Sequence, residues 1–282
     1  MKFRRSGRLV DMTYYMLQHP HSLVPLTYFS EKYNSAKSSI SEDLTIIKET
    51  FEQQGIGTLL TVPGAAGGVK YIPKVDIAEA KLFIDELCEK MAKPERLLPG
   101  GYLYLTDLLG NPSIVNKIGR LFATVFSNRK IDVVMTVATK GINLAYAVAA
   151  QLDVPVVIVR KDSKVTEGST VSINYVSGSS KRIQTMLLAK RSLTEGSNVL
   201  IIDDFMKAGG TINGMISLLD EFQANVSGIG VLVETEGVEE RLVDEYISLT
   251  KLTEVDTREK HIEVKPGTYF QINENKKIGE IE

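Results

Sequence analysis

Hydrophobic positions at the start of the chain repeat at helical spacing. Leu9, Met12 and Met16 are separated by three and four residues, which predicts an amphipathic helix that ends before Pro20. A second, shorter helix is predicted over 25–33, where a proline suits the first turn. Two helices therefore open the chain.

A third helix and a hairpin are predicted to follow. Apolar residues at spacings of four, three and four predict a helix over 39–53, with a capping box formed by Ser39 and Glu42. The segment 57–73 contains two β-rich runs around a glycine and alanine tip, which is typical of a hairpin. Three helices followed by a hairpin is the order of a winged helix-turn-helix domain, which binds DNA with its third helix. The same order also fits a small protein-interaction or dimerisation module.

The pattern changes after residue 79 to strands alternating with helices. The predicted strands cover 131–138, 154–159, 199–202 and 228–233, and the predicted helices cover 142–152 and 212–222. This alternation predicts an α/β domain with a mostly parallel, doubly wound sheet, whose ligands bind beyond the carboxyl ends of the strands. We therefore expect two domains, at 1–74 and 75–282.

Charge is distributed unevenly between these two domains. The whole chain has 33 basic and 35 acidic residues, a net charge of -2, which alone gives no reason to expect nucleic-acid binding. Residues 1–74, however, hold nine basic and six acidic residues, a net charge of +3, and the remainder, with 24 and 29, has a net charge of -5. The small surplus predicts modest DNA affinity that needs two copies of the domain on one site.

The third predicted helix differs in charge between its outer face and its N-terminal start. Its outer face is expected to carry Glu42, Asp43, Glu49 and Glu52, which DNA phosphates would repel. The start of this helix is basic and polar, and its free backbone N–H groups also favour an anion, so we expect it to enter DNA end-on. The candidate DNA contacts are Arg4, Arg5, Arg8, Lys37, Ser38, Ser39, Ser41 and Lys70.

Several other classes of protein are disfavoured. The longest stretch without charged residues, 53–69, contains six glycines and prolines, so no membrane partner is expected. The N-terminus lacks a signal-peptide pattern, and with the lone Cys88 this predicts a cytoplasmic protein without disulfides. His19 and His21 flank a proline in a predicted loop, so no metal site is predicted. No redox cofactor is expected either. Tyr102 and Tyr104 could line a ligand cleft, but aromatic residues in this apolar segment are expected to belong to the core.

The segment 199–214 combines a buried strand, two acids, a glycine-containing turn and the start of a helix. Backbone N–H groups at Lys207, Ala208, Gly209, Gly210 and Thr211 can surround a phosphate at the helix N-terminus. Asp203 and Asp204 are placed to accept hydrogen bonds from vicinal hydroxyls. The segment therefore predicts a site for a phosphorylated sugar.

This segment resembles the loop that binds 5-phosphoribosyl 1-pyrophosphate (PRPP) in the type I phosphoribosyltransferases. The resemblance implies that the acids hold the ribose hydroxyls, often with Mg²⁺, and that 207–211 hold the 5-phosphate. Thr139, Lys140 and Gly141 are similar to the pyrophosphate loop of that family, which often contains a non-proline cis peptide. Lys207 and Ala208 depart from the small residues that are usual there, which puts catalysis in doubt.

A basic segment lies between these two loops. Residues 160–191 hold seven basic and two acidic residues and resemble the flexible hood that closes over PRPP in this family. The net charge of +5 suits a ligand with several negative charges and suits DNA equally well.

Taken together, the two halves resemble the bacterial purine operon repressors. The similar segments are RRSGRL, AKSSISEDL, TLLTVPGAAGGVKYIP, ERLLPGGYLYLTDLLG, ATKGI, KVTEGSTVSINYVSGSS and IDDFMKAGGTING. The resemblance implies a homodimeric repressor of purine biosynthesis and transport genes, released from operator DNA by PRPP, whose phosphoribosyltransferase-like domain binds PRPP without turnover. The alternatives are an active purine phosphoribosyltransferase with an N-terminal regulatory module and, with less support, an RNA-binding regulator.

Overall fold

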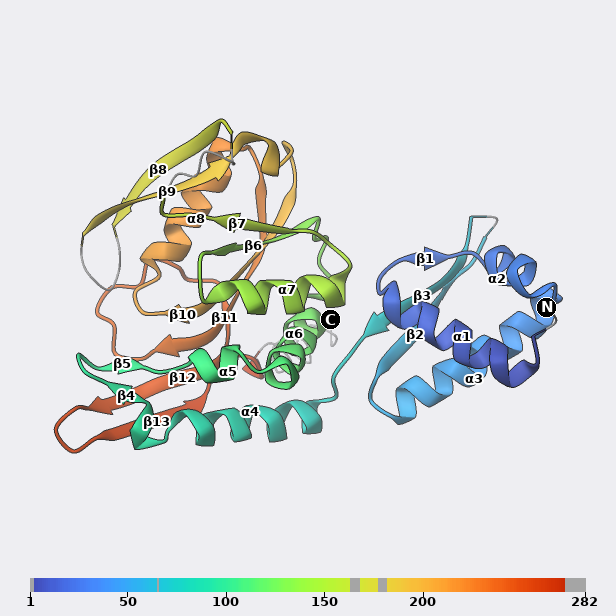
Figure 1. Ribbon diagram of the computed structural model, residues 1–282, viewed down its shortest axis with the longest axis horizontal. Coiled ribbons are helices and arrows are strands. Elements are labelled where there is room, and N and C mark those ends of the chain that lie inside the picture. The colour runs from blue at the N-terminus through green and yellow to red at the C-terminus, as the bar shows by residue number, and fades with distance from the viewer. Residues whose placement is uncertain (1–2, 65, 163–167, 177–181, 272–282) are drawn as a thin grey trace, which may run out of the picture. The chain divides into compact units, whose positions relative to one another are not determined.

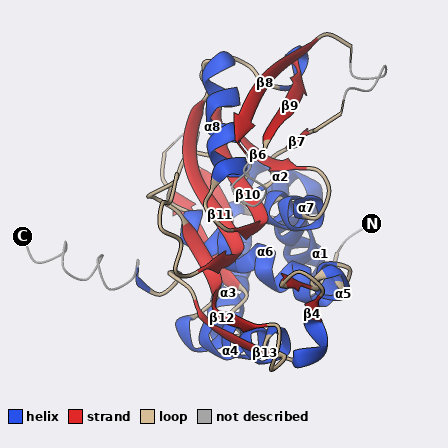
Figure 2. Ribbon diagram, turned by 90° about the vertical axis from the view of Figure 1, so that its left-hand side faces the viewer, coloured by secondary structure: helices blue, strands red, loops and turns tan. Residues whose placement is uncertain are grey.

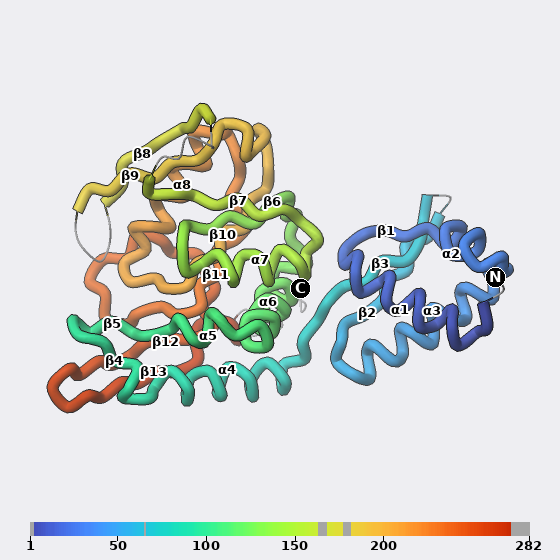
Figure 3. The backbone as a smooth tube through the Cα atoms, viewed as in Figure 1, coloured from blue at the N-terminus to red at the C-terminus, as the bar shows by residue number. Residues whose placement is uncertain are grey.

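The computed structural model describes residues 3–64, 66–162, 168–176 and 182–271 (Figure 1). The chain divides into two compact units, one with the residues up to Ile77 together with 150–153, the other with the rest. Figure 3 traces the backbone through both units. Within the described residues, no helix is long and apolar enough to cross a membrane.

The N-terminal unit is a winged helix. Its elements are α1 (Arg5–Gln18), β1 (Leu23–Val24), α2 (Leu26–Tyr33), α3 (Lys37–Gln53), β2 (Gly57–Val62) and β3 (Gly68–Pro73). The three strands form an antiparallel sheet in the order β1-β3-β2. Met12 and Met16 of α1 and Phe29 of α2 are fully buried in its core together with α3, so the predicted apolar faces meet as expected.

Two expectations about α3 are wrong. The helix begins at Lys37 rather than Ser39, and its N-cap is Ala36, whose side chain makes no capping hydrogen bond. Ser39 therefore lies inside the first turn and forms no capping box. Asp43 is also not on the outer face, because its side chain is fully buried.

The C-terminal unit is an α/β domain. Its helices are α4 (Ile77–Met91), η1 (Pro94–Arg96), α5 (Thr106–Leu109), α6 (Pro112–Phe126), α7 (Gly141–Leu152), η3 (Lys190–Ser192) and α8 (Gly210–Glu221). Its strands are β4 (Leu97–Leu98), β5 (Tyr102–Leu103), β6 (Val133–Val137), β7 (Val156–Val159), β8 (Thr170–Val176), β9 (Ile183–Ala189), β10 (Asn198–Met206), β11 (Asn225–Thr235), β12 (Ile247–Asp256) and β13 (His261–Pro266). The main sheet has the order β13-β12-β11-β10-β6-β7 and is parallel except for β13, which confirms the predicted sheet type.

Both faces of this sheet are covered. Helix α8 and the antiparallel hairpin β8–β9 lie side by side over one face (Figures 1 and 2) and share a buried apolar cluster with β6, β7, β10 and β11. The other face of β11 packs closely against α6, since a Cβ at Gly230 would come within 2.8 Å of Phe122. Ile229 and Val231, on either side of this glycine, join the α8 cluster, as alternation along a strand requires.

Candidate functional site

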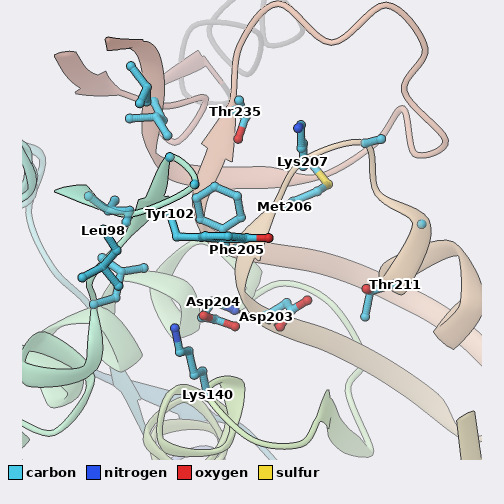
Figure 4. Close-up of a pocket in the computed structure, with 18 of the residues that line it drawn as sticks. Leu98, Tyr102, Lys140, Asp203, Asp204, Phe205, Met206, Lys207, Thr211 and Thr235 are labelled. Carbon is cyan, nitrogen blue, oxygen red and sulfur yellow. Dashed lines mark hydrogen bonds between the residues drawn. The ribbon is translucent and has the colours of Figure 1, made fainter. Parts of the chain in front are cut away.

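The C-terminal unit has a cavity of about 960 Å³ beyond the carboxyl ends of its parallel strands (Figure 4). The end of β10, the turn after it and the start of α8 form one wall. The segment around β4 and β5, with residues of β11, β12 and the loop after β12, forms the opposite wall. The lining residues are 98–103, 105, 140, 203–212, 235, 252, 255 and 257.

Two adjacent carboxylates lie in this cavity. Strand β10 continues to Met206, so Asp203 and Asp204 belong to the strand rather than to the turn after it. Asp203 is 3 % exposed, and its Oδ1 accepts a hydrogen bond from the Asp204 backbone N–H at 3.0 Å. Burial, and next the charge of Asp204, raise the pKa of Asp203 well above its ordinary value, and burial also raises the pKa of Asp204. Such a pair favours a cation or hydroxyl donors as partners.

The turn after β10 has the geometry of an anion cradle. Gly209 is the N-cap of α8 with a φ of 83°, a conformation that favours glycine, and it offers no side-chain cap to the first turn of the helix. The carbonyl of Ala208 accepts a hydrogen bond from the backbone N–H of Leu242 at 2.9 Å. The Leu242 N–H thus fixes the orientation of this carbonyl. The N–H groups of Gly210 and Thr211 belong to the first turn of α8, beside the cavity, where they can bind an anion.

The loop after β6 supplies a positive charge to the same cavity. The peptide bond between Ala138 and Thr139 is cis, and Lys140 lies beside Asp204 (Figure 4). Gly141 begins α7 where no side chain fits, because a Cβ there would lie 2.2 Å from Thr136 Oγ1 and 3.3 Å from Asp203 Oδ1. Close packing at this glycine thus connects the loop to the carboxylate pair.

The structure brings most of the predicted effector residues together. Eight of the ten line the cavity, and the other two, Thr139 and Gly141, flank Lys140. Lys161 was not among the predicted effector residues, but its positive charge lowers the pKa of both aspartates against the effect of burial. Of the predicted hood, 163–167 and 177–181 lie outside the described residues, whereas β8 and β9 pair along their length.

An apolar wall of the cavity was also missed. Tyr102 is 67 % exposed and lies beside Phe205 in the cavity (Figure 4), so the expectation that it belongs to the core is wrong. Tyr104 is likewise 40 % exposed. Gly100 and Gly101, both with positive φ, form the tight connection between β4 and β5 that presents Tyr102. A glycine pair between two short apolar runs is a hairpin signal that could have indicated this wall.

In the N-terminal unit, two of the predicted DNA-binding arginines form ion pairs with the buried carboxylate of Asp43. Asp43 of α3 accepts hydrogen bonds from Arg5 Nε and Arg8 Nε, both at 2.9 Å, and Arg8 also approaches it through a second nitrogen at 2.7 Å. Arg8 further donates to Ser35 Oγ at 3.3 Å, and its side chain is only 14 % exposed. Arg5 remains 55 % exposed. The structure therefore uses Arg8 to join α1 to α3.

The other predicted DNA contacts lie on two parts of the winged helix. Arg4 is exposed at the N-cap of α1, and Lys37, Ser38 and Ser41 are exposed on the first turns of α3. Ser39 and Lys70 are half-buried, the latter on β3, the central strand of the small sheet.

Comparison with known protein families assigns each unit. Residues 4–73 match the family described as "Bacterial purine repressor, N-terminal", and residues 105–268 match the "Phosphoribosyl transferase domain" family. A DNA-binding winged helix joined to a phosphoribosyltransferase fold defines a transcription regulator whose second domain has the fold of a transferase.

Relatives that match along nearly the whole chain identify the family. The "purine biosynthesis transcriptional repressor" of Bacillus subtilis is 74 % identical over 96 % of this chain and 95 % of the relative. The "purine biosynthesis transcriptional activator" of Lactococcus lactis subsp. lactis is 48 % identical over 95 % of this chain and 98 % of the relative. The chain belongs to this family of bacterial purine biosynthesis regulators, whose members are named for transcriptional control and not for catalysis.

A solved structure agrees with the fold of the C-terminal unit. The adenine phosphoribosyltransferase of Rhodothermus marinus superposes with a TM-score of 0.53 at 23 % identity, covering 61 % of this chain and 99 % of that one. At this identity the likeness shows the phosphoribosyltransferase fold alone.

Proposed function

We propose that the protein is a cytoplasmic, homodimeric repressor of purine biosynthesis and transport genes that leaves operator DNA when PRPP binds its cavity. The observation that carries the proposal is the carboxylate pair Asp203 and Asp204 beside the uncapped start of α8. PRPP has vicinal hydroxyls, a 5-phosphate and a pyrophosphate, and these groups match the aspartates, the turn 207–211 and the loop 139–141 in turn.

Mg²⁺ suits this site as a companion of the ligand. Burial raises the pKa of both aspartates, so a divalent cation bound with PRPP would stabilise their charged forms. Among the described residues no group of three or more His, Cys, Asp or Glu side chains is placed to hold a metal. The pyrophosphate and hydroxyl oxygens of PRPP would therefore supply much of the coordination.

DNA binding is proposed for the exposed basic and polar residues of the winged helix. Arg4, Arg5 and Lys37 present positive charge near the starts of α1 and α3, where DNA phosphates also meet free helix N–H groups. Arg8 contributes indirectly by fixing α1 against α3. Because residues 1–74 carry a net charge of only +3, two copies on one operator are needed for useful affinity.

PRPP is proposed to act as an effector without being consumed. Lys207 is exposed and Ala208 has no side-chain donor, so the turn can bind a phosphate through its N–H groups without the hydroxyl that the transferases commonly add. A pyrophosphate-release assay with adenine, guanine, hypoxanthine and xanthine is expected to show no turnover. Clear turnover with any base would favour the active phosphoribosyltransferase instead.

The decisive experiment is fluorescence anisotropy on promoter DNA from upstream of purine genes. Wild-type protein is expected to bind and to be released by PRPP with Mg²⁺. Asp203→Asn should bind the same DNA but resist release, whereas Asp220→Asn, an exposed substitution on α8, should behave like the wild type. Release of Asp203→Asn at the wild-type PRPP concentration would refute the assignment of the cavity.

A further inference from the structure

The segment 236–246, between β11 and β12, supports the phosphate turn from behind. Its Leu242 N–H donates to the Ala208 carbonyl at 2.9 Å, and Val243 packs against Gly209 so closely that a Cβ on that glycine would lie 3.0 Å from it. The turn 207–211 therefore has contacts with this segment in addition to its chain connections to β10 and α8.

Arg241 holds this segment to the end of β11. Its Nη1 donates to Glu234 Oε2 at 2.8 Å, and its Nη2 donates to the Thr235 carbonyl at 2.7 Å. It also donates to the Tyr246 hydroxyl and lies over the ring of that tyrosine, 5.2 Å from its centroid. The Arg241 guanidinium thus connects the middle of the segment both to the end of β11 and to Tyr246, the last residue of the segment.

Glu234 makes this anchor rigid. The carboxylate is 3 % exposed, and besides Arg241 it accepts hydrogen bonds from Tyr246 Oη at 2.5 Å and Ser248 Oγ at 2.7 Å. A buried carboxylate with these three partners is satisfied, and removal of Arg241, its cationic partner among the described residues, would leave an uncompensated charge. Glu234 is also the register partner of Met206, the residue just before the phosphate turn.

We propose that Arg241 is a positioning residue for the 5-phosphate part of the effector site. By fixing 236–246, it places the Leu242 N–H where it holds the Ala208 carbonyl, and so it orients the N–H groups of 207–211 toward the ligand. Arg241 does not itself line the cavity. The inference rests on the proposed function for the identity of the ligand.

If Arg241 has this role, its replacement should weaken binding of the 5-phosphate part of PRPP and leave binding of the pyrophosphate part unchanged. The pyrophosphate loop 139–141 belongs to the connection between β6 and α7, whereas Arg241 acts on the turn between β10 and α8. Ribose 5-phosphate and inorganic pyrophosphate can therefore report on the two parts separately, in the full-length protein.

Calorimetric titrations of Arg241→Met, with Mg²⁺ present, test the proposal. The variant should bind ribose 5-phosphate about 3- to 10-fold more weakly, the loss expected for one displaced hydrogen-bond donor, and should bind pyrophosphate as the wild type does. Arg129→Met is the matched control, because Arg129 also pairs with a backbone carbonyl, that of Ser227, and lies over a ring, that of Phe126, but near the start of β11. The control should bind both ligands normally.

Equal weakening for both ligands, or unchanged ribose 5-phosphate affinity, would overturn the positioning role. If Arg241→Met does not fold, Val243→Ala removes the apolar support of Gly209 without a charge change, and it should show the same selective loss. Failure of the wild-type protein to bind either ligand would refute the proposed function, and the inference with it.

Discussion

Asp43 gives the most direct test of how the winged helix is held together. Replacing Asp43 with Asn keeps the size of the side chain but removes the charge that Arg5 and Arg8 share. We expect this change to destabilise the N-terminal unit more than any single loss of an exposed ion pair in the same unit.

The magnitude follows from the burial of the three partners. Removal of one partner from a buried ion pair costs about 3–5 kcal/mol, because the other charge is left uncompensated. Here Arg5 is 55 % exposed and can regain water, whereas Arg8 is 14 % exposed and cannot do so without moving. We therefore expect the lower end of that range, about 3 kcal/mol.

Hydrogen exchange measured by mass spectrometry on the full-length protein provides the local readout. The most protected amides of α3 should exchange about 100-fold faster in Asp43→Asn, and the peptides of β10 and β11 should be unchanged. The control is Glu42→Gln, since Glu42 is 71 % exposed and lies 3.7 Å from Arg5, a pair expected to contribute close to nothing. An Asp43→Asn variant that exchanges like the control would refute the idea that this cluster stabilises the unit.

Three further predictions concern the two sites. Since burial raises the pKa of Asp203, the ligand-free folded state binds protons that the unfolded state releases, so thermal stability should fall as pH rises from the ordinary aspartate range through the raised pKa. Asp203→Asn should weaken this dependence, leaving the part that Asp204 contributes, and should be about 1 kcal/mol more stable at neutral pH in thermal melts. Gly141→Ala places a methyl group 2.2 Å from Thr136 Oγ1, and calorimetry should show weakened pyrophosphate binding. Lys37→Ala should lower the slope of log K against log salt for DNA by about one unit, and an unchanged slope would exclude a phosphate contact.

Much of the architecture could be predicted because the local pattern determines it. In β10 and α8 an apolar strand, a glycine turn and an amphipathic helix follow directly in sequence, so the cradle between them needs no distant contact to be recognised. The extension of β10 to Met206 was not predicted, because polar residues at 203 and 204 resemble the end of a strand. The strand continues through them because β11 pairs with Asp203 and again with Phe205 and Met206, on either side of Asp204.

The error at Asp43 could have been avoided from helical spacing. Asp43 lies three residues after Ile40 and four before Ile47, so it shares the buried face of α3 with both. An acid on a buried face requires a partner, and the basic start of α1 was the available source. Arg5 and Arg8 were instead predicted only to contact DNA, because charged side chains were expected to be exposed.

The apolar wall and the Arg241 network could not be predicted from local pattern. Tyr102 meets Phe205 only because the sheet brings a hairpin more than a hundred residues earlier in the chain to the end of β10. Arg241 pairs with Glu234, but five other acids lie within 236–246, and sequence spacing does not distinguish among these carboxylates. Both the contact of Tyr102 with Phe205 and the pairing of Arg241 with Glu234 depend on the tertiary structure, which the pattern of a single segment does not reveal.

The proposed release from DNA sets an energetic requirement that the cavity must meet. To shift DNA occupancy from 99:1 to 1:99, PRPP must bind the released state about 10⁴-fold more tightly than the DNA-bound state, a difference of about 5.5 kcal/mol. In the proposed homodimer two cavities share this requirement, so each must supply about 2.7 kcal/mol, roughly 100-fold in affinity. Hydrogen bonds to charged groups contribute about 1.5–3 kcal/mol each, so one or two contacts made in only one state are enough. We expect such contacts at the turn 207–211, because the Leu242 N–H and Val243 hold the backbone of this turn in position. A small displacement of 236–246 would change the direction of the N–H groups of the turn without unfolding the sheet.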